Sequence, residues 1–91
     1  EILPDNFSLY QNYPNPFNPS TTIRFEVPKS SFVNITVYDI MGREIKQLVN
    51  GMKNAGNYEV NFDGSNLTSG VYFYKMTAGD FSETKKLALV K

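Results

Sequence analysis

The chain has 91 residues, with nine Lys+Arg against nine Asp+Glu and neither cysteine nor histidine. A net charge of zero gives no field that attracts nucleic acid or an anionic membrane surface. Without cysteine and histidine the chain has no disulfide framework, no thiolate or imidazole metal site and no Ser/His/Asp relay. The composition therefore predicts one non-catalytic domain without cofactor or metal, which binds no nucleic acid and does not insert into a membrane.

A proline-rich stretch, NYPNPFNPST, occupies residues 12–21 and follows a possible short strand at residues 7–10. Each proline fixes its own φ and lacks a backbone donor, so the stretch can form neither a helix nor a central strand. Because prolines are tolerated at sheet edges, we expect it to lie along the rim of the fold, where Tyr13 and Phe17 close the core. A docking element for a partner is the alternative. The residues assigned to this N-terminal structural motif are Pro14, Asn15, Pro16, Phe17, Asn18 and Pro19.

From residue 21 onward, apolar and polar residues alternate in about six runs, a pattern typical of half-buried strands. Apolar residues nowhere recur at helical spacing over three turns. Turn signals separate the runs, and residues 50–56 and 63–70 are predicted to be loops. Short strands divided by such turns predict an all-β, immunoglobulin-like antiparallel β-sandwich of about six to seven strands. The predicted strands are residues 21–27, 32–40, 43–49, 57–62, 71–78 and 81–90.

Aromatic rings are expected to carry much of the core, since the chain has no tryptophan. Each ring contributes a few kcal/mol when it is buried, about 1.5 to 3 for a phenylalanine. The candidate core rings are Phe25, Phe62, Tyr72 or Tyr74, and Phe81.

Three carboxylates, Asp39, Asp63 and Asp80, lie beside predicted turns. Carboxylate oxygens in loops are typical calcium ligands, but the twelve-residue calcium loop pattern is absent. Turn chemistry explains these aspartates better, because an aspartate side chain accepts hydrogen bonds from backbone groups two residues on.

Three stretches together resemble a known family. They are LYQNYPNPFNPSTTIRFEVP (9–28), VYDIMGREIKQLV (37–49) and SGVYFYKMTAGDFSETKKLALVK (69–91). The sequence is similar to the type A C-terminal sorting domain of the type IX secretion system, a family closely related to the immunoglobulin-like domain of the flagellar hook-capping protein. Those flagellar relatives tend to have tryptophan where Phe62 stands here, which favours the sorting branch.

The resemblance implies that the domain is a sorting signal for export and not a catalyst. A cargo protein crosses the inner membrane by a signal peptide, its sorting domain is recognised in the periplasm, and the outer-membrane translocon passes it to the cell surface or medium. A surface peptidase and attachment complex is the second implied partner. Residues 1–6 would then be the linker to a preceding cargo domain, and residues 7–91 the sorting domain. The resemblance assigns recognition by the secretion machinery to Gly70, Tyr72, Lys85, Lys86 and Lys91.

Each of these residues also has a purely structural explanation. Gly70 suits a turn that needs a φ other residues resist, and Tyr72 suits the core. Lys85 and Lys86 are adjacent, so on a strand one side chain would aim inward unless a bulge intervenes. A solvated edge strand protected by lysines is the other possibility. Lys91 offers a partner a distinct chain end if it is the natural C-terminus.

Two alternative functions come from other classes of protein. One is a structural or accessory immunoglobulin-like module of an extracellular multidomain enzyme. The other is a carbohydrate-binding module, in which exposed aromatic residues such as Tyr10 or Tyr13 stack on sugars. It predicts at least three coplanar exposed rings.

Overall fold

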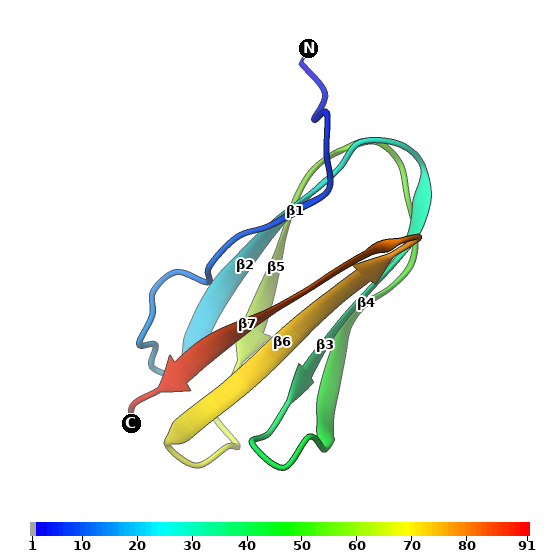
Figure 1. Ribbon diagram of the computed structural model, residues 1–91. Coiled ribbons are helices and arrows are strands. Elements are labelled where there is room, and N and C mark those ends of the chain that lie inside the picture. The colour runs from blue at the N-terminus through cyan, green and yellow to red at the C-terminus, as the bar shows by residue number, and fades with distance from the viewer. Residues whose placement is uncertain (1) are drawn as a thin grey trace.

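The computed structural model describes residues 2–91, in which two antiparallel sheets face each other (Figure 1). The three-stranded sheet has the order β1-β2-β5 and the four-stranded sheet the order β4-β3-β6-β7. These residues contain no helix, and so none that is long and apolar enough to cross a membrane. The architecture confirms the predicted all-β, immunoglobulin-like sandwich. The strands are β1 Ser8–Leu9, β2 Ser20–Val27, β3 Ser31–Tyr38, β4 Glu44–Lys53, β5 Gly56–Asp63, β6 Gly70–Ala78 and β7 Phe81–Leu89.

The core lies between the sheets and is built by the alternation of the strands. On β2, β3 and β6 every second residue is buried, as their apolar spacing predicts. Four of the predicted rings are buried, and the fifth, Phe81, is half-buried and stacks on Phe7 with ring centroids 5.5 Å apart. Phe17 joins the core beside Phe62. The buried rings are Phe17, Phe25, Phe62, Tyr72 and Tyr74.

Strand β4 is longer than the sequence pattern indicates. The prediction of a loop at 50–56 is wrong, because β4 continues to Lys53, with Asn50 opposite Asn34 and Gly51 opposite Val33. The glycine that signals a turn in the sequence lies in an ordinary strand, where an added Cβ would meet nothing within 4 Å. Pairing with β3 is irregular in two places, and this interrupts the alternation predicted for residues 43–49.

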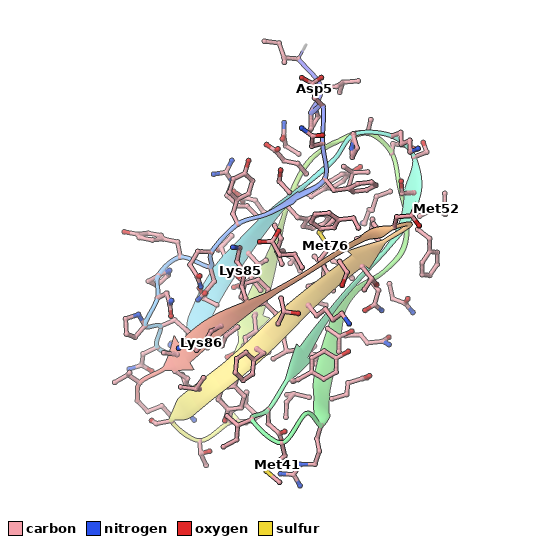
Figure 2. The ribbon with its side chains drawn as sticks, in the orientation of Figure 1. Asp5, Met41, Met52, Met76, Lys85 and Lys86 are labelled. Atoms are coloured by element: carbon pink, nitrogen blue, oxygen red, sulfur yellow. The ribbon has the colours of Figure 1, made fainter. Side chains whose placement is uncertain are left out.

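The two ends of the sandwich carry different parts of the chain. Asp5 lies at one end and Met41, in the β3–β4 turn, lies at the other (Figure 2). The C-terminus and the β5–β6 loop lie at the same end as Met41 (Figure 1). We call this the C-terminal end of the sandwich.

Candidate functional site

The proline-rich stretch covers the outer edge of β7, the last strand. The Asn15 side-chain oxygen accepts a hydrogen bond from the Ala88 amide at 3.0 Å. The Phe17 amide donates to the Ala88 carbonyl at 2.9 Å, and the Val90 amide donates to the Phe17 carbonyl at 3.0 Å. These bonds occupy backbone groups that an edge strand otherwise leaves open to a foreign strand.

The two rings of the stretch have opposite environments. Phe17 is buried, and its ring centroid lies 6.0 Å from that of Phe62. Tyr13 is 82% exposed, so the prediction that it closes the core is wrong. The reason lies in its backbone, which exchanges two hydrogen bonds of 3.0 Å with Thr22 of β2. This pairing places the Tyr13 ring with Thr22 on the outer face of the sheet.

Asn12 is a buried polar residue that the sequence does not single out as functional. Its side-chain amide donates to the Thr21 hydroxyl at 3.0 Å and to the Pro14 carbonyl at 3.1 Å. Its backbone amide donates to the Tyr74 hydroxyl at 2.8 Å, and that hydroxyl donates to the Tyr10 carbonyl at 2.7 Å. Burial raises the pKa of Tyr74 to about 12. The start of the proline-rich stretch is therefore fixed to the centre of β6.

The other residues of the motif lie at the surface. The peptide bonds that precede Pro14, Pro16 and Pro19 are all cis. The exposed members are Pro14, Asn15, Pro16, Asn18 and Pro19.

Lys85 and Lys86 lie on opposite faces of β7 (Figure 2). The β6–β7 register runs without a shift, so no bulge separates them. Lys85 shares the inward face with buried Leu87, and its Nζ lies 3.0 Å from the Glu83 carboxylate, while Lys86 is exposed. The inward lysine is accommodated because it lies at the margin of the core and is paired with a carboxylate.

Gly70 and Tyr72 begin β6 and shape the loop before it. Gly70 has φ +153, a conformation that residues with a side chain rarely adopt. Tyr72 is buried, and its hydroxyl donates to the Thr68 carbonyl at 2.7 Å. Tyr72 therefore holds the β5–β6 loop against the sandwich, and Gly70 sets the backbone direction where that loop enters β6.

The last residue is bonded to the same loop. The Lys91 amide donates to the Ser69 hydroxyl at 2.9 Å, and its Nζ donates to the Ser65 carbonyl at 2.5 Å. Asp63 accepts from both the amide and the hydroxyl of Ser65, and the hydroxyl bond is the main cause that holds the Asp63 pKa below its usual value. Lys91 thus lies at the C-terminal end of the sandwich as a fixed group.

A groove of about 500 Å³ separates this loop from the β3–β4 turn. Both Gly70 and Tyr72 line it, and across the groove lie Ile40 and Met41, which are 70% and 75% exposed. Such exposed apolar side chains beside a concave surface mark interaction sites in soluble domains. The structure therefore brings together two of the three stretches that carry the family resemblance.

Asp39 fixes the shape of the β3–β4 turn. Its Oδ1 accepts from the amides of Met41 and Arg43, both at 2.9 Å, and its Oδ2 lies 2.8 Å from the Arg43 Nε. The hydrogen bond from the Arg43 amide is the main cause that holds the Asp39 pKa below its usual value. This carboxylate is therefore a turn cap, as expected.

At the C-terminal end of the sandwich the described residues form a surface groove and a fixed chain end. Within residues 2–91 no group of three or more His, Cys, Asp or Glu side chains is placed to hold a metal ion. The groove combines polar side chains such as Asp39, Arg43 and Thr68 with the exposed Ile40 and Met41.

A family model described as the secretion system C-terminal sorting domain matches residues 11–90, and the chain belongs to this family. No curated protein and no solved structure matches the chain. Family membership makes the domain a C-terminal sorting signal for type IX secretion, which directs a cargo without catalysis and marks it for the cell surface or extracellular space. The resemblance to the sorting family is confirmed.

Proposed function

We propose that the type IX machinery recognises this domain at the C-terminal end of the sandwich. The observation that carries the sorting function is the family match over residues 11–90. The proposal adds a location to that function: the groove beside Gly70 and Tyr72 and the bound Lys91 form one surface. Lys85 and Lys86 lie further along β7, opposite Tyr74 and Phe73 of β6, and add a half-exposed and an exposed cation outside the groove.

The route and the partners complete the proposal. The domain passes through the periplasm joined to a cargo that precedes residues 1–6, which act as the linker, and residues 7–91 form the sorting unit. The outer-membrane translocon reads the C-terminal end, and a surface peptidase and attachment complex acts afterwards in the linker. The position of Asp5 at the far end of the sandwich supports this arrangement, because a cargo there leaves the recognition surface open (Figure 2).

The test is a secretion assay with matched variants. A signal peptide and a fluorescent reporter are fused to residues 1–91 and expressed in a bacterium with an intact type IX system and in its translocon mutant. Truncation after Leu87 is a poor probe, because it removes Leu89, which is buried in the core. Point variants of exposed residues separate recognition from folding.

Met41 and Met52 provide the matched pair. They are 75% and 66% exposed and lie at opposite ends of the molecule (Figure 2). We expect Met41→Glu to stall the reporter in the periplasm, and Met52→Glu to be secreted like the parent. Lys91→Ala should reduce secretion by less than Met41→Glu.

Two outcomes contradict the proposal at different levels. If both methionine variants are secreted, the machinery reads another surface. If the parent fusion stays periplasmic in both strains although it is folded, this chain does not sort the reporter, and the accessory immunoglobulin-like module becomes the better explanation.

A further inference from the structure

A second groove lies on the outer face of the three-stranded sheet, away from the recognition surface proposed above. It has a volume of about 530 Å³ and is formed by residues 10–13 together with strands β2 and β5. Two tyrosine rings line it, Tyr13 at 82% exposure and Tyr10 at 40%. Tyrosine rings usually bury their apolar faces, so two exposed rings beside one concavity indicate a binding surface.

Hydrogen bonds hold the backbone that carries both rings. Tyr13 exchanges two hydrogen bonds of 3.0 Å with Thr22, and the Tyr10 amide donates to the Arg24 carbonyl at 3.0 Å. The Tyr10 carbonyl also accepts from the buried hydroxyl of Tyr74 at 2.7 Å. The main chain therefore does not have to be ordered when a ligand binds.

Charged groups of both signs lie between the rings and β5. The Arg24 Nε is 3.9 Å from the Glu59 carboxylate, and the two side chains are 60% and 68% exposed. The Arg24 guanidinium also lies 5.4 Å from the centre of the Tyr10 ring. The groove therefore offers donors and acceptors side by side with no excess charge.

This combination fits sugar hydroxyls better than other ligands. A hydroxyl both donates and accepts, so neighbouring hydroxyls can satisfy the Arg24 guanidinium and the Glu59 carboxylate together. The apolar face of a pyranose ring can lie on a tyrosine ring. A phosphate group would gain from Arg24 but be repelled by the Glu59 carboxylate 3.9 Å from the Arg24 Nε, so the groove has no net attraction for an anion. A polyproline segment docks on aromatic grooves but has no backbone donor for that carboxylate.

We propose that this groove binds a short neutral oligosaccharide. Tyr10 and Tyr13 stack on pyranose rings, and Arg24 and Glu59 bond their hydroxyls. Two rings do not form the extended flat platform that a module for insoluble polysaccharide presents, so the ligand is a short soluble chain. The proposal is independent of the sorting function.

The test is an NMR titration of the 91-residue chain. The ¹⁵N-labelled protein is titrated to about 10 mM, a range that detects weak binding, with cellohexaose, mannohexaose and chitohexaose, and separately with decaproline. We expect at least one saccharide to shift the amides of residues 10–13, 22–24 and 59. Tyr13→Ala should weaken the binding of that saccharide about tenfold or more, as truncation of a central aromatic residue does.

Three further variants make the result specific. Tyr13→Phe keeps the ring and should retain the affinity within about threefold. Phe32→Ala removes a ring that is 55% exposed on the other sheet and should change nothing. Arg24→Met removes the donors and should weaken binding even if Tyr13→Ala proves unstable. The proposal is overturned if no saccharide moves these amides, if only decaproline does, or if Phe32→Ala weakens binding as much as Tyr13→Ala.

Discussion

The hydroxyl of Tyr74 accepts a hydrogen bond from the Asn12 amide at 2.8 Å and donates one to the Tyr10 carbonyl at 2.7 Å. These partners lie 62 and 64 residues away along the chain. One phenol oxygen therefore joins the centre of the four-stranded sheet to the segment that leads into the proline-rich stretch. Asn12 and Tyr74 are both buried, so water cannot replace these bonds without an opening of the fold.

Tyr74→Phe should destabilise the domain. It leaves a buried amide without its acceptor, which costs about 1 to 3 kcal/mol. The free energy of unfolding is measured with urea. Tyr13→Phe is the control, since the ring is 82% exposed, and its change should stay within about 0.5 kcal/mol. Equal losses in the two variants would show that the buried phenol bonds do not contribute.

Alkaline pH should weaken the parent protein more than Tyr74→Phe. The Tyr74 pKa is raised from 10.0 to about 12, mainly by burial. Between these values the unfolded state releases the proton and the folded state keeps it, so stability present below pH 10 is lost as the pH rises. The stability gap between the two proteins should narrow by about 1 to 2 kcal/mol from pH 9 to pH 11.5 in urea titrations. If the free energy of unfolding of the two proteins falls equally with pH, the raised pKa of Tyr74 is not the cause of the loss.

Gly64→Ala should destabilise the domain through crowding. A Cβ there would lie 3.2 Å from the side chains of Leu89 and Phe17. Both neighbours are buried, so their displacement is expected to cost about 1 to 2 kcal/mol. Gly51→Ala is the matched control, because nothing lies within 4 Å of the added Cβ, and thermal unfolding should show it unchanged or stabilised. If Gly64→Ala leaves the stability unchanged, the side chains of Leu89 and Phe17 can move aside without a cost in free energy.

Asn15→Ala should loosen the covered edge of β7. The Asn15 side chain accepts from the Ala88 amide at 3.0 Å, so its removal should speed hydrogen exchange at Ala88 about tenfold. The matched control is Asn18→Ala in the same Asn-Pro context, because the bond to Ala88 comes from Asn15 and not from Asn18. Unchanged exchange at Ala88 in both variants would show that the Asn15 side chain does not protect this amide.

The sequence predicts most of the strands, because their alternation reflects burial on one face. The pattern fails at β4, where Gly51 and Asn50 imitate a turn although they pair with β3. Glycine and asparagine permit a turn without requiring one. Whether residues 50 and 51 form a turn or continue the strand depends on their pairing with β3. The prediction that Tyr13 closes the core fails for a similar reason, since the direction of its ring depends on pairing with Thr22.

The candidate site is predictable only where its chemistry is local. Gly70 has its unusual φ where a loop passes into a strand, and the pairing of Lys85 with Glu83 joins residues two apart on one face. Asn12 cannot be recognised in advance, because its partner Tyr74 is 62 residues away. The groove likewise joins Met41 to Gly70, and only the completed sheet order brings these two stretches together.

The opposite positions of Asp5 and Met41 have a further consequence for a sorting signal (Figure 2). The molecule measures 38 Å along its longest axis and only 16 Å along its shortest. Asp5 and the groove lie at opposite ends of the sandwich. In the proposed arrangement the attachment point of a cargo is therefore separated from the recognition surface by the length of the strands, so the same signal can serve cargoes of different fold.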